Sequence, residues 1–451
     1  MRSTGHTDPA APVWDSARRC HATASRVAAV GLAAFLALAL SGCGAGTTPS
    51  STLSATPTVT ATALATATVS PTVTPTPTPT QLKPTPTPTP APKPLSFVAT
   101  GSMHTARSAA TATLLKNGKV LIAGGGYNVG AVDSIYASAE IYDQTAGKFT
   151  KTGSRTAARI DATAVLLGNG KVLIAGGEGC SDPKHCGSVP ADSNVHLASA
   201  ELYDPTSGKF TPTGSMAETR VGAPAALLPD GLVLIAGDSE WAELYNPDSG
   251  RFTRTGKETG PDNGTATLLP DGKVLVTGDS FGDTVAQLYD ESSGKFTTIS
   301  LTLPAGTPLV QHKGLDVPRT APGAATLLSD GRVLFFEDGY LETCDPQTGV
   351  CADAGFISPA ADWYGATATQ LSDGRVLFEG GSLYPRVTDE SVGEPTNAAV
   401  LYDPADGTFQ TGSMSASREY QTATFLPKDS VLIAGGEDTG GTLASAELFK
   451  P

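Results

Sequence analysis

The side chains in this sequence that are best suited to chemistry are its six cysteines and six histidines. Cys344 and Cys351 enclose the turn-like hexapeptide DPQTGV, and Cys180 and Cys186 enclose SDPKH, which contains His185. Pairs at such spacing act as metal ligands, as a redox pair or as a structural disulfide. The elements that carry the cysteines decide among these alternatives.

The chain lacks the sequence motifs of common enzymes. It contains no GxSxG, HExxH, P-loop or zinc-type CxxC spacing. The histidines are scattered over positions 6, 21, 104, 185, 196 and 312, and no pair of them suggests a copper-like site beside an unpaired cysteine. We therefore predict neither a metal site nor a cofactor, with a metal site in CSDPKHC (180–186) as the alternative.

The N-terminal segment has the pattern of an export signal. Arginines at 2, 18, 19 and 26 precede the apolar run VAAVGLAAFLALAL (27–40), which is shorter than a membrane-spanning helix. The run ends in LSGC (40–43), which resembles the lipobox of bacterial lipoproteins. The resemblance implies a signal peptide over 1–42, a lipid anchor at Cys43 and a location outside the cytoplasm. An ordinary signal peptide is the alternative, and the long leader also suggests a start codon further downstream.

Residues 43–94 carry the lipidated cysteine and then a low-complexity linker. The composition changes to Thr, Pro, Ala and Ser, with PTPTPTPT at 73–80, and offers almost no large apolar side chain for a core. Repeated proline favours extended polyproline II, so this segment spans on the order of 100 Å at ~3.1 Å per residue. We interpret it as a stalk between the membrane and the next domain.

Residues 95–451 contain seven copies of one sequence unit. The copies of its central strand are GKVLIAGG (118–125), GKVLIAGG (170–177), GLVLIAGD (231–238), GKVLVTGD (272–279), GRVLFFED (331–338), GRVLFEGG (374–381) and DSVLIAGG (429–436). A leucine-rich strand and a PDG-type turn precede the central strand, and a segment like AELYDPTSGKFTPTG follows it. Each unit therefore predicts four antiparallel strands, and seven such units predict an all-β, seven-bladed propeller.

The repeats are similar to those of the kelch family and of galactose-oxidase-like propellers. The likeness rests on the double glycine after the central strand and on the later tyrosine and phenylalanine. The last unit ends at ASAELFKP (444–451), and an unmatched fourth strand, LSFVATGSM (95–103), begins the domain. We predict that this N-terminal strand completes the last blade and closes the ring.

The loops between second and third strands differ most among the repeats, so the face that bears them is the expected binding surface. An arginine recurs seven residues before the first leucine-type position of the inner strand. The members are Arg107, Arg159, Arg220 and Arg418, with Arg319 one residue out of register and Trp363 in the sixth unit. One reading is a cationic funnel for an anionic or sugar ligand. The other is a ring of structural ion pairs with acidic residues that follow the second strand, such as Glu178, Asp238, Asp279, Asp338 and Glu437.

Three aromatic residues complete the candidate ligand-binding set. Trp241, Trp363 and Tyr364 either stack on a sugar or pack between blades. A formal net charge of −14 argues against a nucleic-acid partner. The leading hypothesis is a monomeric binding module that takes a glycan or protein ligand; the alternative is a carbohydrate-active oxidase, lyase or epimerase whose site comes from several loops.

The repeat alignment also assigns the cysteines. In five other units a tyrosine and a phenylalanine stand seven residues apart, and Cys344 and Cys351 occupy the same two positions in the fifth unit. We predict a cross-strand disulfide there and a second one between Cys180 and Cys186, which an exported protein permits.

Overall fold

The computed structural model describes residues 94–129, 132–180, 189–190, 194–258, 262–280, 283–302, 324–337, 339–357, 361–385 and 393–451. The chain divides into the units Met1–Ala91 and Pro92–Pro451, and only the second contains described residues. The predicted signal peptide, Cys43 and the linker up to residue 93 therefore lie outside the description. In the described part, no helix has the length and apolar character needed to cross a bilayer.

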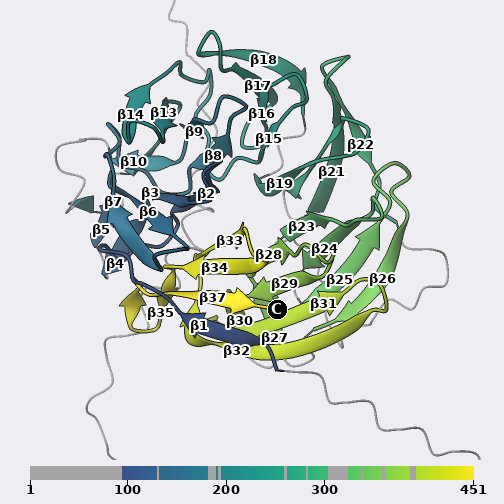
Figure 1. Ribbon diagram of the computed structural model, residues 1–451. Coiled ribbons are helices and arrows are strands. Elements are labelled where there is room, and N and C mark those ends of the chain that lie inside the picture. The colour runs from purple at the N-terminus through teal and green to yellow at the C-terminus, as the bar shows by residue number, and fades with distance from the viewer. Residues whose placement is uncertain are drawn as a thin grey trace, which may run out of the picture. The chain divides into compact units, whose positions relative to one another are not determined.

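Seven antiparallel blades of four strands each follow one another around a common axis and form a β-propeller, as predicted, and the sheet of the sixth blade contains two further strands (Figure 1). Blade 1 consists of β2 (Thr111–Leu114), β3 (Val120–Ala123), β6 (Ala139–Asp143) and β7 (Lys148–Lys151). Blade 2 consists of β8 (Thr163–Leu166), β9 (Val172–Ala175), β13 (Ala200–Asp204) and β14 (Lys209–Pro212). Blade 3 consists of β15 (Ala225–Leu227), β16 (Val233–Ile235), β17 (Trp241–Asn246) and β18 (Arg251–Lys257).

Blades 4 to 6 repeat this order further along the chain. Blade 4 consists of β19 (Asp262–Leu268), β20 (Val274–Ser280), β21 (Asp283–Asp290) and β22 (Lys295–Ile299). Blade 5 consists of β23 (Ala324–Leu327), β24 (Val333–Glu337), β25 (Tyr340–Cys344) and β26 (Cys351–Phe356). Blade 6 consists of β28 (Thr367–Gln370), β29 (Val376–Glu379), β31 (Glu394–Asp403) and β32 (Thr408–Arg418).

Blade 7 joins the two ends of the propeller. It consists of β33 (Thr422–Leu426), β34 (Ser430–Ala434) and β37 (Ala446–Lys450), with β1 (Ser96–Ala99) as its outer strand. β1 and β37 are antiparallel, with Ser96 opposite Lys450 and Ala99 opposite Glu447. The predicted closure is confirmed, and it satisfies the hydrogen-bonding groups along the outer edge of β37.

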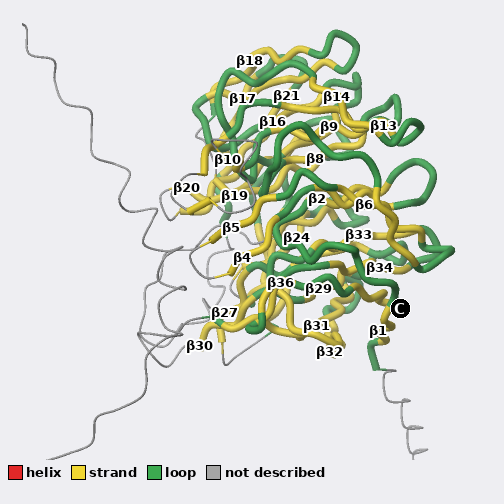
Figure 2. The backbone as a smooth tube through the Cα atoms, turned by 90° about the vertical axis from the view of Figure 1, so that its left-hand side faces the viewer, coloured by secondary structure: helices red, strands yellow, loops and turns green. Residues whose placement is uncertain are grey.

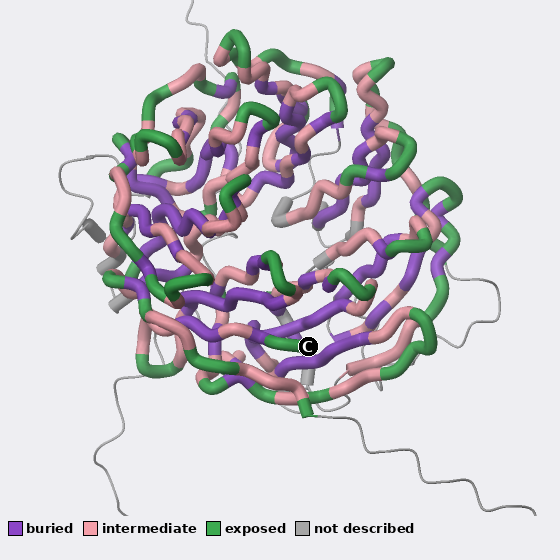
Figure 3. The backbone as a smooth tube through the Cα atoms, viewed as in Figure 1, coloured by how far each residue is buried: buried purple, intermediate pink, exposed green. Residues whose placement is uncertain are grey.

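The core lies between neighbouring blades. The second strand of each blade contains at least three consecutive apolar residues, which suits a strand covered on both faces, and all four residues of β3 are buried (Figure 3). Val120 and Ile122 pack with Leu432 and Ala434 of blade 7 across the closure. Each fully buried valine, leucine or isoleucine contributes about 1.5–3 kcal/mol to folding, so this seam stabilises the closed ring.

Hydroxyl contacts connect blade 7 to blade 1 and continue from blade to blade as far as blade 4, at the outer strands. The Tyr142 hydroxyl lies 2.7 Å from Thr100 Oγ1, and the equivalent Tyr203 hydroxyl lies 2.9 Å from Thr152 Oγ1. Each tyrosine also packs against the phenylalanine opposite, with ring centroids 4.8 Å apart for Tyr142 and Phe149. The conserved spacing seen in the sequence is therefore a cross-strand aromatic pair.

In blade 5 a disulfide takes the place of this aromatic pair. Cys344 and Cys351 stand directly opposite each other on β25 and β26, and their sulfurs are bonded at 2.04 Å. The prediction for this pair is confirmed. Cys180 is also disulfide-bonded, but its predicted partner Cys186 lies outside the described residues.

Several blades carry insertions between their second and third strands, and we name the face that bears these connections the loop face. The insertion strands are β4 (Gly126–Val129), β5 (Val132–Ile135), β10 (Glu178–Cys180), β11 (Val189–Pro190), β12 (Asn194–His196), β30 (Ser382–Pro385), β35 (Glu437–Asp438) and β36 (Gly441–Thr442), and β27 (Ala361–Tyr364) pairs with β30. Figure 2 shows β4, β5, β10, β27 and β30 on one side of the propeller. The expected concentration of variable loops on one face is therefore present.

Candidate binding site in the central pocket

The recurring arginines lie between blades and are buried. Arg107, which is 1% exposed, donates from Nη1 to the Gly124 carbonyl at 2.5 Å and from Nη2 to Glu140 Oε1 at 3.2 Å. Its own carbonyl accepts from the Gly436 amide of blade 7 at 3.0 Å. One residue thus links blade 1, through its side chain, to blade 7, through its backbone.

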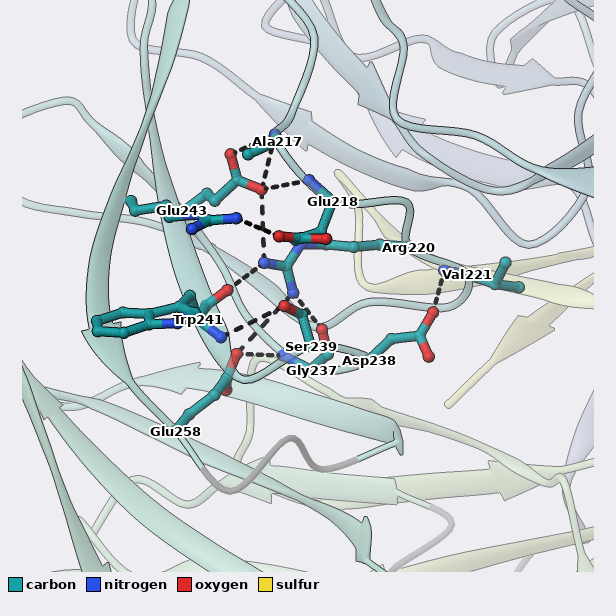
Figure 4. Close-up of polar contacts among 11 residues, drawn as sticks. Ala217, Glu218, Arg220, Val221, Gly237, Asp238, Ser239, Trp241, Glu243 and Glu258 are labelled. Carbon is teal, nitrogen blue, oxygen red and sulfur yellow. Dashed lines mark hydrogen bonds and ion pairs between the residues drawn. The ribbon is translucent and has the colours of Figure 1, made fainter. Parts of the chain in front are cut away.

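The same arrangement repeats around the ring. Arg159, Arg220 and Arg418 are each 1% exposed and each bind the carbonyl of the glycine 17 residues ahead. Figure 4 shows Arg220 directed at the carbonyls of Gly237 and Trp241, with Glu243 Oε1 3.5 Å and Glu258 Oε1 3.9 Å from its guanidinium. These arginines are structural clamps between blades.

A glutamate on the third strand completes each clamp. Glu140 accepts hydrogen bonds from the amides of His104 at 2.8 Å and Thr105 at 3.1 Å, as well as from Arg107. Burial alone would raise the pKa of Glu140, but the bonds from His104 and Thr105 together with the Arg107 cation hold it below its usual value. Glu201, Glu243 and Glu447 occupy the equivalent positions in their blades.

This geometry corrects the expectation of a cationic funnel. The guanidinium groups of Arg107, Arg159, Arg220 and Arg418 are enclosed by protein, so they present no surface to a ligand. The alternative of structural ion pairs agrees better with the structure. The acidic partner of each arginine, however, is a glutamate on the third strand and not an acidic residue that follows the second strand. The AE-hydrophobic-Tyr segment carries that glutamate and was the available signal in the sequence. Arg319 lies outside the described residues.

The aromatic candidates have different environments. Trp363 is 1% exposed, donates from Nε1 to the Gly380 carbonyl at 2.5 Å, and packs edge-on against Phe336. It therefore replaces the arginine clamp, in agreement with its predicted register, and its ring is not available for stacking on a sugar. Trp241 remains 37% exposed at the loop face. The side chain of Tyr364 lies outside the description.

Two residues after each clamp, the backbone enters the left-handed region. The residues at this position are Ala109, Asp161, Gly222, Gly365 and Tyr420, with φ values of 52°, 48°, 62°, 65° and 53°. Their amides and carbonyls bond from blade to blade: Ala109 N to Tyr420 O at 3.0 Å, Asp161 N to Ala109 O at 3.2 Å and Gly222 N to Asp161 O at 2.8 Å. Non-glycine residues in this conformation are uncommon and often mark functional sites.

These residues surround a pocket at the axis of the propeller. The cavity, of about 450 Å³, is lined by the starts of the inner strands of blades 1 to 4 and 7, and we name it the central pocket. Its polar side chains are Asp161, Thr163, Thr265, Tyr420 and Gln421. Because the inner strands begin beside the ends of the second strands, the pocket opens toward the loop face.

Sequence reasoning missed the pocket side chains. Asp161 and Tyr420 occupy one repeat position at which the units carry alanine, aspartate, glycine or tyrosine. That variability, two residues after an arginine that recurs in four units, was the only sequence signal. A single-sequence alignment does not reveal that this position faces the propeller axis.

The charged side chain in the lining of the pocket is the carboxylate of Asp161. Asp161 is open to solvent in the pocket but is flanked by the pocket walls, and this partial desolvation, together with Glu178, raises its pKa to about 6. Gln421 is 7% exposed and donates from Nε2 to the Glu379 carbonyl at 2.9 Å, while its Oε1 has no hydrogen-bond partner among the described residues. Complete burial raises the pKa of Glu379, which lies behind Gln421, to about 8.

Known proteins resemble this chain in structure only. No protein-family model matches it, and no curated protein matches its sequence. A fungal alcohol oxidase of the AA5 family, solved in complex with copper, matches with a TM-score of 0.57 and 14% identity over 79% of this chain and 76% of the oxidase. A structure of YjhT matches with a TM-score of 0.49 and 13% identity over 77% of this chain and 95% of its own. With the seven blades, the first likeness supports a galactose-oxidase-like propeller fold.

The described residues do not fit a copper site like that implied by this neighbour. Their two histidines are separate: His104 Nδ1 lies 2.9 Å from Glu140 Oε2 in a clamp, and His196 belongs to β12. Among the described residues, the only group of three metal-ligand side chains close enough to share an ion is Glu342, Cys344 and Cys351, and its two sulfurs are bonded to each other.

Proposed function

We propose that this protein is an exported, lipid-anchored binding module whose propeller takes a glycan or protein ligand on the loop face. The central pocket carries the proposal, because it combines a carboxylate, an amide, two threonine hydroxyls and a tyrosine in one cavity. Such a set of polar groups with an aromatic ring is suited to a polyhydroxylated ligand. The volume of about 450 Å³ lies in the range of small-molecule sites.

Exposed aromatic residues in the pocket wall and on the loop face support the same surface. Tyr420 is 60% exposed in the pocket wall, and Tyr127 and Trp241 are each 37% exposed on loop-face segments. Exposed aromatic side chains beside variable loops supply contact area at low entropic cost. The lipobox-like LSGC and the Thr/Pro-rich linker add the proposal that the propeller is displayed away from a membrane.

A glycan array probed with the purified full chain in mild detergent tests the proposal. We expect binding to a defined set of glycans and loss of that binding when Tyr420 is replaced by alanine. A Val350→Ala variant is the control, since Val350 is also exposed but lies in the turn of the blade 5 disulfide hairpin. Retention of full binding by Tyr420→Ala contradicts a role for the pocket.

The alternative function is a carbohydrate-active enzyme, and the likeness to the AA5 alcohol oxidase is the observation that favours it. It predicts turnover of a sugar or alcohol by the purified chain, with peroxide release when the reaction is an oxidation. We place this second because the described residues supply no donor set like the one copper requires. Metal-dependent turnover that depends on Asp161 would reverse the order of the two proposals.

A further inference from the structure

The turn between the first and second strands is built alike in blades 1 to 6, but one of its residues differs between blades. Blades 1 and 2 carry the exposed asparagines Asn117 and Asn169 there. In both, Oδ1 accepts a hydrogen bond from the amide two residues later, Lys119 N at 3.1 Å and Lys171 N at 3.0 Å. In blades 3 to 6 an aspartate accepts the same bond; these residues are Asp230, Asp271, Asp330 and Asp373.

A glycine in the left-handed region follows each of the two asparagines. The φ values are 77° for Gly118 and 84° for Gly170. Glycine adopts this conformation without steric cost, and it has no side chain to shield its own backbone nitrogen. The side-chain amide carbon of the preceding asparagine is therefore open to attack by that nitrogen.

The reaction available to such a pair is the loss of the side-chain nitrogen as ammonia. The Gly118 nitrogen attacks Cγ of Asn117 and forms a C–N bond, while the Cγ–Nδ2 bond breaks and Nδ2 leaves as ammonia with the proton of the Gly118 N–H. Water then adds to one of the two carbonyls of the cyclic imide and opens it to aspartate or isoaspartate. The hydrogen bond from Lys119 N to Oδ1 assists the attack, because it stabilises the negative charge that develops on this oxygen.

A main-chain hydrogen bond slows the first step. Gly118 N donates to the Leu115 carbonyl at 2.9 Å, and Gly170 N donates to the Leu167 carbonyl at 2.9 Å. Each bond must open before the nitrogen can attack. Because the turns are exposed, this opening is local and leaves the strands of the blade in place. The folded chain should therefore react, although more slowly than the unfolded chain.

The aspartate product fits the turn, since four other blades hold an aspartate at this position with the same hydrogen bond. Isoaspartate does not fit in the same way, because it adds one carbon to the main chain before Gly118. That extra carbon would displace the two bonds that close the turn, from Leu115 N to the Lys119 carbonyl at 2.8 Å and from Gly118 N to the Leu115 carbonyl.

We infer that Asn117 and Asn169 are sites of spontaneous deamidation in the folded protein. Each conversion adds one negative charge at the end of the blade opposite the loop face, because the inner strands run from the central pocket to these turns. The inference does not depend on the proposed binding function.

Peptide mapping by mass spectrometry tests it on the purified full chain, kept folded at pH 8 and 37 °C and sampled over weeks. Asn246 is the internal control. Its Oδ1 accepts from Asp248 N at 2.9 Å in the same way, but Pro247 follows it, and a proline nitrogen has no hydrogen to lose. We expect Asn117 and Asn169 to deamidate at least about tenfold faster than Asn246.

Asn117→Asp separates the effect of the aspartate product from that of isoaspartate. This variant should melt like the native chain, because the turn accommodates aspartate, and its Asn169 should still deamidate. The peptide of the third Asn–Gly step, Asn263–Gly264, is read separately, since the side chain of Asn263 lies outside the described residues.

Equal rates at Asn117, Asn169 and Asn246 overturn the inference, as does an absence of conversion at the first two. Conversion that occurs only in urea also overturns it, because the bonds to Leu115 and Leu167 would then protect the folded turns completely. A melting temperature clearly below that of the native chain in Asn117→Asp contradicts the fit of the aspartate product.

Discussion

Trp363 and Val400 replace, in one blade, both members of the buried Arg–Glu clamp. Trp363 donates to the carbonyl of Gly380, the glycine 17 residues ahead, as each arginine does in its own blade. Val400 stands two residues before the aromatic residue of the third strand, the position that Glu140 and Glu447 occupy in their blades. Both lie in one apolar cluster. An apolar pair therefore performs the same connection as the ionic pair, which agrees with the high desolvation cost of buried charges.

This exchange predicts how the clamps respond to mutation. Arg418→Met should lower the free energy of unfolding by about 3–5 kcal/mol, because it leaves Glu447 buried without its cation. Arg418→Trp combined with Glu447→Val should lose less than the two single changes together. Urea unfolding measures both, and Arg375→Met, in a more exposed ion pair, is the control with an expected loss below about 1 kcal/mol. Additive losses in the double variant would contradict the exchange.

The raised pKa of Glu379 predicts that the free energy of unfolding falls as the pH rises. Its pKa in the folded protein, about 8, lies above the ordinary value of 4.5, because it is fully buried and Thr367 Oγ1 is its only side-chain hydrogen-bond partner among the described residues. The folded state therefore retains the proton, and the stabilisation is complete below pH 4.5 and lost as the pH approaches 8. Linkage gives a loss on the order of 4 kcal/mol between pH 5 and 9.

Glu379→Gln tests this pH dependence because glutamine keeps the hydrogen bond to Thr367 without a charge. Thermal melts from pH 5 to 9 should be flatter in this variant than in the native chain, and the variant should be more stable at pH 8. The exposed Glu394→Gln is the matched control and should keep the native slope. Parallel melting curves for Glu379→Gln and the native chain would show that Glu379 does not hold a proton.

The closure of the ring predicts the effect of an N-terminal truncation. Deletion of residues 95–103 removes β1, the contact of Thr100 with Tyr142 and the buried Met103. We expect the melting temperature to fall by at least about 5 °C and self-association to appear, because the edge of β37 becomes free. Calorimetry and size-exclusion chromatography measure these effects. A deletion of the same length within the linker is the control, and identical melting of the two deletions would refute closure by β1.

The disulfide of blade 5 predicts a rescue by aromatic residues. Replacing Cys344 and Cys351 by alanine should cost about 2–3 kcal/mol, because a short covalent loop is lost. Tyrosine at 344 and phenylalanine at 351 should recover part of this loss, since that pair fills the same positions in blade 1. Thermal melting of the three proteins decides the matter, and an alanine variant as stable as the native chain would contradict the prediction.

The sequence was sufficient for the fold because the repeats constrain one another. Seven copies of one strand pattern, the offset of LSFVATGSM and the Tyr–Phe spacing are all visible without coordinates, and each corresponds to an observed pairing. The candidate site was harder to predict from the sequence. Arg107 looked like a ligand group because its partner, Glu140, lies 33 residues away, and burial depends on how adjacent blades pack.

The pocket residues were missed for a related reason. Asp161 and Tyr420 are 259 residues apart and meet only because the last blade adjoins the first around the axis. Local sequence patterns predict strands and turns, whereas the closeness of these two residues depends on the closed ring. The left-handed conformation at Asp161 is likewise imposed by bonds to neighbouring blades and leaves no local signature.

At the left-handed position two residues after each clamp, the ring is held by main-chain hydrogen bonds, so its stability does not depend on which side chain stands there. One backbone conformation is shared by Ala109, Asp161, Gly222, Gly365 and Tyr420. The hydrogen bonds that link these positions, from blade 7 through blades 1 and 2 to blade 3, are made by main-chain atoms. A substitution there alters the chemistry at the axis without disturbing the clamps two residues earlier. The side chains at the axis can thus differ from one blade to the next while the backbone frame that holds them stays constant.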